Sequence, residues 1–180
     1  MIHIGTAGYS YEDWRGPFYP PGLGKNRFFA HYVEHFDCVE LNFTYYRQPE
    51  AGTLARLVAQ TPPHFRFALK AFQDLTLGRS RDLAAYAAYR AGLAPVLERQ
   101  QLAAVLLQFP NSFRLTRESV DHLRFIRQQW PDWPLVVEFR HSEWVSEERT
   151  FDFLREQKLA FCAVDEPALR SRFLSGGVVF

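Results

Sequence analysis

Short apolar segments alternate with longer amphipathic ones along the chain, and this alternation constrains the fold more than any other feature. Residues 2–6, 38–42, 65–70, 103–109, 135–140 and 160–165 have the length and composition of strands. The segments between them, residues 26–36, 50–60, 80–99, 116–130 and 147–158, space their apolar residues as helices do. Strands separated by helices predict βαβ units and therefore a parallel sheet.

Individual residues in these segments predict where helices begin and where they are interrupted. Asn26 is expected to cap the first helix, because its side chain can accept a bond from a free backbone N–H. Gly92 and Pro95 are expected to break or kink the helix over residues 80–99. The Pro- and Gly-rich clusters lie between elements, so we expect one domain covering residues 1–180.

The alternation of side chains within each strand favours a closed barrel over an open sheet. In residues 65–70, Phe67 and its parity partners are apolar, whereas the opposite face carries Lys70 at its carboxyl end. An open doubly wound sheet packs helices on both faces and does not need this asymmetry. A TIM-type (β/α) barrel does, since polar groups gather at its C-terminal mouth. We therefore predict an α/β fold of this barrel type.

The same argument selects one convergent set of polar residues at the carboxyl ends of the strands. The set comprises Glu40, Asn42, Lys70, Gln108, Glu138, Arg140 and Asp165. Burying this many ionisable groups is unfavourable unless they pair closely, and function is the usual reason to keep them. The alternative is a buried ion-pair network that only fills the barrel mouth.

These residue types support several chemistries without specifying one. Glu138, Asp165 and Lys70 are the predicted catalytic residues, as general acids or bases, and Lys70 also suits a carboxylate or a Schiff base. Arg140 is the predicted anchor for a carboxylate or phosphate. The other predicted substrate-binding residues are Asn42, Glu40 and Gln108 of the set, and His141, which lies just past the fifth strand.

A metal site is not predicted from the histidines. His31, His35, His64 and His122 lie away from the strand ends, and His3 is expected to point into the barrel near its start. A zinc-type cluster is therefore not expected. The oxygen ligands of Glu40, Glu138 and Asp165 leave a magnesium or manganese ion as an alternative.

Aromatic residues crowd the loops that follow the strands. Trp14, Tyr46 and Trp144 are predicted to contact a substrate, because rings above a polar mouth suit stacking on a flat ligand. The alternative is a hydrophobic lid that packs on itself.

Charge and composition narrow the partners and the compartment. The formal net charge is +1, so no global field indicates nucleic acid or an anionic membrane. The chain has neither a secretory signal pattern nor an apolar run of membrane-spanning length, which predicts a cytoplasmic protein. Cys38 and Cys162 lie in apolar strands and are expected to be reduced, buried thiols. The predicted partner is a small polar or anionic ligand; a nucleotide or nucleic acid is the alternative.

Several motifs, in order along the chain, resemble the YecE-like family, domain of unknown function 72. They include the segments Trp14-Arg15-Gly16-Pro17-Phe18-Tyr19-Pro20, Val39-Glu40-Leu41-Asn42, Thr44-Tyr45-Tyr46-Arg47, Phe65-Arg66-Phe67-Ala68-Leu69-Lys70, Leu107-Gln108-Phe109-Pro110, Val137-Glu138-Phe139-Arg140-His141 and Val164-Asp165. The resemblance implies a TIM-barrel-like fold and assigns no reaction.

The chain departs from the family pattern in two places. Thr76 is followed by Leu77 where the family usually has His, and residues 171–180 show no seventh strand with a Tyr-x-Arg-x-His-Gly pattern. A TIM barrel typically has eight strand–helix units. We therefore expect a C-terminally truncated barrel with about six of them. Open edges of such a barrel predict self-association, with residues 173–180 as a substitute strand. An inactive fragment of a longer family member is a further alternative.

Overall fold

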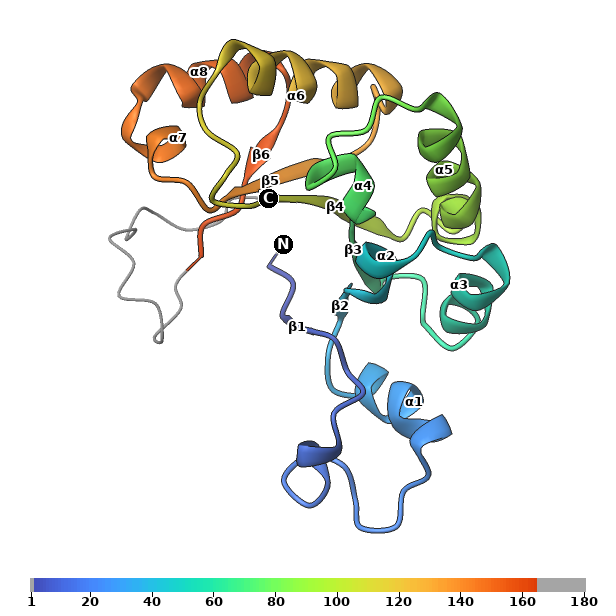
Figure 1. The fold of residues 1–180 in the computed structure, drawn as a ribbon. Coiled ribbons are helices and arrows are strands. Elements are labelled where there is room, and N and C mark those ends of the chain that lie inside the picture. Colours follow the sequence, from blue (N-terminus) through green and yellow to red (C-terminus); the bar gives the residue numbers. More distant parts are fainter. Residues whose placement is uncertain (1, 165–180) are drawn as a thin grey trace. The chain divides into compact units, whose positions relative to one another are not determined.

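The computed structural model describes residues 2–164 (Figure 1). These residues form one six-stranded sheet in the order of the sequence, which confirms the predicted α/β fold. Adjacent strands are parallel from β1 to β3 and again from β4 to β6. The strands are β1 (Gly5–Ala7), β2 (Cys38–Leu41), β3 (Arg66–Lys70), β4 (Leu102–Phe109), β5 (Leu135–Phe139) and β6 (Ala160–Phe161).

Helices connect the strands, as the alternation of segments predicts. They are α1 (Phe28–Val33), α2 (Phe43–Tyr46), α3 (Ala51–Val58), α4 (Gln73–Thr76), α5 (Leu83–Glu98), α6 (Arg117–Gln129), α7 (Glu143–Ser146) and α8 (Glu148–Glu156), with 3-10 turns η1 (Glu12–Trp14) and η2 (Lys25–Arg27). Two short helices, α2 and α7, directly follow the strands β2 and β5 and so lie next to their carboxyl ends.

The chain divides into two compact units. Of the described residues, the first comprises those up to Lys70 and Ala87–Ala103, and the second comprises Ala71–Tyr86 and those from Ala104 onward. Within the second unit, helices α6 and α8 lie on the same side of strands β5 and β6 (Figure 1).

Burial in the strands follows the predicted parity. Phe65, Phe67 and Leu69 are fully buried, whereas Arg66 and Lys70 on the opposite face are half-buried. In β4, the apolar set that includes Leu107 and Phe109 is also fully buried. In β2 and β3 one face is therefore packed core and the polar positions lie on the other face, whereas in β5 residues on both faces are buried.

The first strand begins later than the sequence predicts. Ile2 and Ile4 are 87% and 68% exposed, and β1 covers only Gly5–Ala7. A Cβ atom at Gly5 would lie 2.2 Å from the Cys38 carbonyl oxygen, so the pairing with β2 requires a residue without a side chain. The orientation predicted for His3 is wrong as well, since its Nδ1 lies within hydrogen-bond distance, 3.0 Å, of the Asp37 carboxylate at the surface.

Two predictions about helix ends and breaks are also wrong. Asn26 lies inside η2, and the residue that precedes α1 is Arg27, which makes no capping bond. Helix α5 runs unbroken through Gly92 and Pro95. Leu93 and Val96 beside them are fully buried, and packing of this kind outweighs an unfavourable helix propensity.

A stack of aromatic rings forms part of the core of the second unit. Trp144 lies parallel to Phe139, with ring centroids 4.2 Å apart, and to Phe113, at 5.4 Å. Phe113 in turn stacks on Phe109 at 4.0 Å. The stack joins residues at the carboxyl ends of β4 and β5 to α7, so it holds the loops after both strands in place.

His122 of α6 is buried beside this aromatic stack. Its Nε2–H donates to the Leu75 carbonyl at 2.8 Å, and Nδ1 has no hydrogen-bond partner in the described part of the chain. Burial lowers the pKa of His122, because a charged imidazolium is poorly solvated there.

We expect this buried histidine to make the protein less stable in mild acid. An unfolded histidine titrates near pH ~6.5, so below that pH the unfolded state binds a proton that folded His122 resists. The free energy of unfolding should fall as pH decreases from about 6.5 toward the lower folded pKa. Urea denaturation at several pH values measures how the free energy of unfolding changes with pH. This change should be smaller in His122→Gln than in the parent, whereas His64→Gln, at an exposed histidine, should match the parent. The same pH dependence in all three proteins would contradict the assignment.

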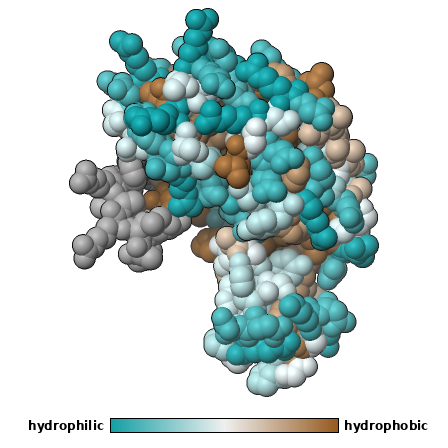
Figure 2. All heavy atoms as spheres, in the orientation of Figure 1, coloured by the Kyte–Doolittle hydropathy of each residue, from teal (hydrophilic) through white to brown (hydrophobic). Residues whose placement is uncertain are grey.

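The described helices show no membrane span. None of them is both long enough and apolar enough to cross a bilayer. In the view of Figure 2, hydrophilic residues cover much of the face that the helices present.

Candidate functional site

Glu138 is the most buried charged residue at the carboxyl ends of the described strands, at 4% exposure. It lies opposite Gln108 in the parallel register of β4 and β5, so both side chains share one face of the sheet. Gln108 Nε2 donates to Glu138 Oε1 at 2.7 Å. The register between β4 and β5 therefore brings together two site residues that the sequence places at strand ends.

Arg140 adds a second, charged donor to the same oxygen. Its Nε lies 2.7 Å from Glu138 Oε1, and its backbone N–H donates to the Phe109 carbonyl at 3.2 Å. The Arg140 side chain is 32% exposed, whereas that of Glu138 is 5% exposed. Arg140 thus extends from a buried carboxylate to the solvent.

A backbone contact with the first residue of α7 bears on the tautomer of His141. The backbone N–H of Glu143 donates to His141 Nδ1 at 3.2 Å, so Nδ1 is an acceptor. In a neutral ring the proton must then be on Nε2. His141 can therefore offer an N–H donor at the end of β5.

An ion pair that sequence reasoning missed connects the loops after β4 and β5. Arg114 bonds the Glu143 carboxylate through both Nε and Nη2, and the Leu115 N–H donates to the same carboxylate at 3.3 Å. The Arg114 guanidinium lowers the pKa of Glu143. Arg114 lies in the loop after β4 and Glu143 begins α7, both outside the strands, so strand parity does not mark either residue.

Trp144 is placed differently from its predicted role as a substrate contact. It is fully buried, and its Nε1–H donates to the Phe113 carbonyl at 2.7 Å. Its burial and this hydrogen bond fix the ring within the core, so little of its surface is exposed to a ligand. Its observed role is packing next to the site.

In the first unit, Lys70 ends β3 as predicted. Its Nζ lies 4.7 Å from the centre of the Tyr45 ring, in a cation–π contact. Its backbone carbonyl accepts bonds from the Thr44 hydroxyl at 2.6 Å and the Tyr89 hydroxyl at 3.0 Å. Sequence reasoning missed Thr44 and Tyr89, which hold the end of the strand through its backbone.

The remaining predicted polar residues of this unit lie at the end of β2. Glu40 is half-buried in the strand, opposite Ala68 in the register, and its carbonyl accepts from the Gly8 N–H at 2.8 Å. Asn42 directly precedes α2. Asp165 lies outside the described residues. That all seven polar residues form one site stays a prediction.

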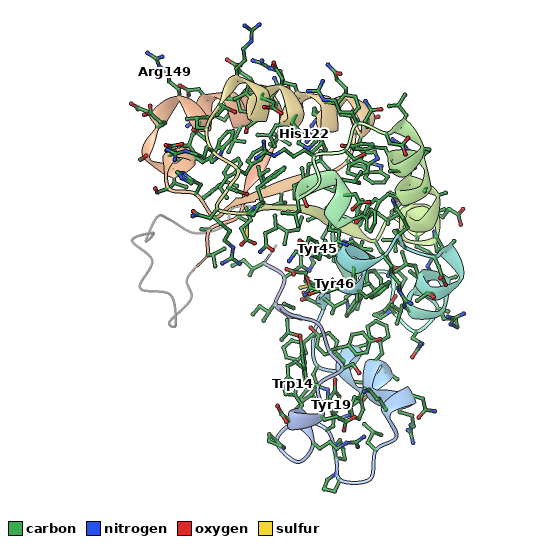
Figure 3. All side chains as sticks on the ribbon, in the orientation of Figure 1. Trp14, Tyr19, Tyr45, Tyr46, His122 and Arg149 are labelled. Carbon is green, nitrogen blue, oxygen red and sulfur yellow. The ribbon has the colours of Figure 1, made fainter. Side chains whose placement is uncertain are left out.

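The aromatic loop residues separate into a packed group and an exposed group. Trp14 lies near Tyr19 and packs edge-on against Phe18 at 5.6 Å (Figure 3). This favours the alternative of aromatic residues that pack on one another. Tyr46 is 73% exposed, and its ring meets the Tyr45 ring edge-on, with the ring centroids 5.1 Å apart.

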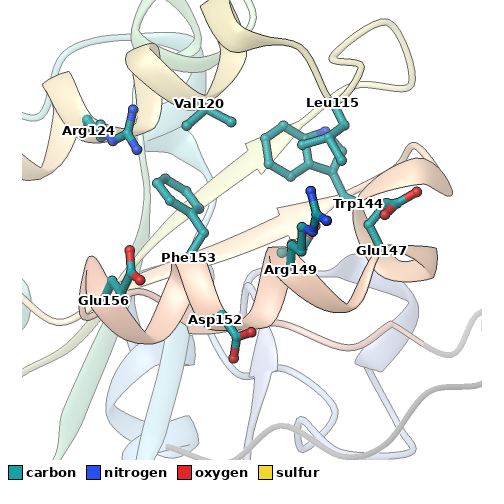
Figure 4. A pocket seen from close by; sticks show the side chains of 10 residues that line it. Leu115, Val120, Arg124, Trp144, Glu147, Arg149, Asp152, Phe153 and Glu156 are labelled. Atoms are coloured by element: carbon teal, nitrogen blue, oxygen red, sulfur yellow. The ribbon is translucent and has the colours of Figure 1, made fainter.

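A surface cavity of about 520 Å³ lies among α6, α7 and α8 (Figure 4). Its lining includes Arg124, Arg149, Asp152 and Phe153. Arg124 already bonds Asp121 at 3.0 Å and lies over the Phe153 ring. Trp144 is the one predicted site residue in the lining, so the cavity and the predicted site are separate features.

Both cysteines are free and half-buried. Burial raises the pKa of the Cys38 thiol to about 11, so it is protonated at neutral pH. The free thiols agree with the prediction of reduced cysteines, although both side chains are half-buried rather than fully buried.

Comparison with known proteins places the chain in a family. A family model described as "Protein of unknown function DUF72" matches residues 3–177. The chain belongs to the DUF72 family. The UPF0759 protein YunF of Bacillus subtilis (strain 168) is 32% identical over 178 residues, which are 94% of this chain and 62% of that protein. The chain therefore spans less than two thirds of the length of this relative.

Two solved DUF72 structures are similar to this chain. A DUF72 family protein from Thermotoga maritima MSB8 is 37% identical, with a TM-score of 0.83 over 94% of this chain and 67% of that one. A DUF72 family protein from Enterococcus faecalis V583 is 24% identical, with a TM-score of 0.79 over 94% of this chain and 65% of that one. The second likeness supports the fold alone. Both agree with the α/β barrel-like fold that the family resemblance implies.

Proposed function

We propose that the carboxyl ends of β4 and β5 bind a small polar molecule with an anionic group, on which Glu138 acts as a general acid or base. One observation carries this proposal: the buried Glu138 Oε1 accepts bonds from both Gln108 and Arg140 at 2.7 Å. Sites of parallel βα barrels lie at this end of their strands.

Arg140 is the proposed anion anchor. A guanidinium carries five N–H donors in a planar fork that suits a carboxylate or phosphate, and the Nε of Arg140 lies 2.7 Å from Glu138 Oε1. The side chain is partly exposed, so a carboxylate or phosphate from solution can approach it. A ligand held there would lie within reach of the Glu138 carboxylate.

Gln108 and His141 are proposed positioning and donor groups. Gln108 fixes the Glu138 carboxylate through its amide N–H. His141 presents Nε2–H when its ring is neutral, which suits a hydroxyl or carbonyl oxygen of the ligand. Lys70 and Asp165 keep their predicted catalytic roles as proposals, and this site does not require them.

Replacing Arg140 should weaken ligand binding by at least about tenfold, the usual cost of losing one charge-assisted hydrogen bond. A thermal-shift screen of carboxylates, phosphates, sugar phosphates and nucleotides would identify the ligand class. Its affinity would then be measured by titration calorimetry for the parent, Arg140→Met and Arg140→Lys. The lysine variant should also bind more weakly, because it keeps the charge but loses the fork.

Arg117→Met is the matched control, since the Arg117 side chain is 97% exposed and lies on helix α6. It should bind like the parent. Equal binding by the parent and Arg140→Met would reject the anchor. Glu138→Gln should bind the ligand but lose any turnover. If ligand binding and turnover were both unchanged in this variant, Glu138 would be only a structural partner of Arg140.

A second candidate function is the binding of a nucleotide or a single-stranded nucleic acid. The observation that favours it is Tyr46, a 73% exposed ring beside exposed Arg47, since bases stack on such rings. Stabilisation by an oligonucleotide that decreases steeply with salt, and that Tyr46→Ala removes, would favour this function over the first.

A further inference from the structure

Three side chains with metal-binding atoms meet at the end of α1. His31, Glu34 and His35 each offer one ligand atom, and these atoms lie within 4.8 Å of one another. The helix ends at Val33, and the N–H groups of Glu34 and His35 bond back to His31 and Tyr32 at 3.2 and 3.0 Å. This tightened last turn brings all three side chains to one side.

Each imidazole ring of His31 and His35 bonds a backbone carbonyl through one nitrogen, which leaves the other nitrogen available to bind a metal. His31 Nε2 lies 3.1 Å from the Phe18 carbonyl oxygen, and His35 Nδ1 lies 2.8 Å from the His31 carbonyl oxygen. A carbonyl only accepts, so both of these nitrogens must carry protons. In the neutral rings, His31 Nδ1 and His35 Nε2 are therefore unprotonated. Metal-binding histidines typically donate their other N–H to a carbonyl in this way.

Packing holds both rings close to this arrangement. Phe18 meets the His31 ring edge-on at 5.1 Å and the His35 ring at 5.2 Å. The two imidazole rings lie 4.5 Å apart. His31 is half-buried, whereas Glu34 and His35 are exposed and can adjust.

The carboxylate completes the set of ligands. Glu34 Oε2 lies 3.9 Å from His31 Nδ1, which is longer than a hydrogen bond. Two ligands on a tetrahedral zinc ion lie roughly 3.4 Å apart, so a small movement of the exposed Glu34 closes the site. The carbonyl end of a helix also favours a cation.

We propose that His31, Glu34 and His35 bind a divalent transition-metal ion, with zinc as the reference ion. Two imidazoles and one carboxylate are borderline ligands that suit Zn²⁺, Ni²⁺ or Cu²⁺ better than Mg²⁺. Three protein ligands leave a fourth position for water or for a group from another molecule. The site is separate from Glu138 and Arg140, so neither proposal depends on the other.

The test is a zinc titration of the full chain in competition with a chelating dye. We expect one equivalent of Zn²⁺ to bind, with at least about tenfold weaker binding in His35→Ala and Glu34→Gln. His35 and Glu34 are exposed, so these variants should fold, which circular dichroism checks. His64→Ala, another exposed histidine, is the matched control and should bind like the parent.

Cobalt reports the ligands directly. The Co²⁺-loaded parent should show the visible bands of a four- or five-coordinate site, without a thiolate charge-transfer band from Cys38 or Cys162. His35→Ala should lose those bands, and His64→Ala should keep them. Absence of competitive Zn²⁺ binding by the parent, or equal binding by the parent and His35→Ala, would overturn the proposal.

Discussion

Replacement of Trp144 by alanine is expected to lower the free energy of unfolding by about 3–5 kcal/mol. The side chain is fully buried, and its ring stacks on Phe139 at 4.2 Å and on Phe113 at 5.4 Å. The substitution removes this packing and leaves a cavity next to β5. It also leaves the Phe113 carbonyl without the Nε1–H donor. Urea denaturation followed by far-ultraviolet circular dichroism would measure the loss.

Trp144→Phe separates packing from hydrogen bonding. Phenylalanine keeps a stacked ring but loses the donor to the Phe113 carbonyl, so the expected loss is smaller than for alanine. If Trp144→Ala were as stable as the parent, Trp144 would not be part of the core. Its role as a ligand contact, predicted from the sequence, would then regain support.

Gly92→Ala is expected to destabilise the protein by about 2 kcal/mol or more, although alanine is the better helix former. A Cβ atom at Gly92 would lie 2.1 Å from the Pro49 carbonyl oxygen and 2.7 Å from its carbon. These are backbone atoms that cannot rotate away. Helix α5 would have to move from the segment that precedes α3, and the same denaturation measurement would show the loss.

Gly52→Ala in helix α3 is the matched control. Its added Cβ would meet only the Arg56 guanidinium, at 4.0 Å, so nothing opposes the gain in helix propensity. We expect this variant to be more stable by about 0.5–1 kcal/mol. Changes of opposite sign in the free energy of unfolding for Gly52→Ala and Gly92→Ala would support the close backbone approach at Gly92. A stabilising Gly92→Ala would contradict it.

Side-chain parity predicts the strands well because burial repeats with the same period. Phe67 and Leu107 are fully buried where the alternation places them. The same reasoning fails at Ile2 and Ile4, because the pairing of β1 depends on a backbone approach at Gly5 that no hydropathy pattern records. Helix propensity fails at Pro95, because the burial of Leu93 and Val96 outweighs the local preference of proline.

Parity and register together predict part of the candidate site. Gln108 and Glu138 meet because they occupy equivalent positions on neighbouring strands, and the sequence shows both positions. Arg114 and Glu143 could not be predicted, because their ion pair depends on the conformation of two loops. His31 and His35 show the reverse case. Their spacing is visible in the sequence, but the metal-binding tautomers depend on the Phe18 and His31 carbonyls.

The central claim is that an anionic molecule binds at the carboxyl ends of β4 and β5. Hydrogen–deuterium exchange with and without the anionic ligand from the screen tests it most directly. The account predicts that bound ligand slows exchange in the loops over residues 110–116 and 140–147, and that Arg140→Met abolishes this protection. Protection confined to other segments, or unchanged by Arg140→Met, would contradict it.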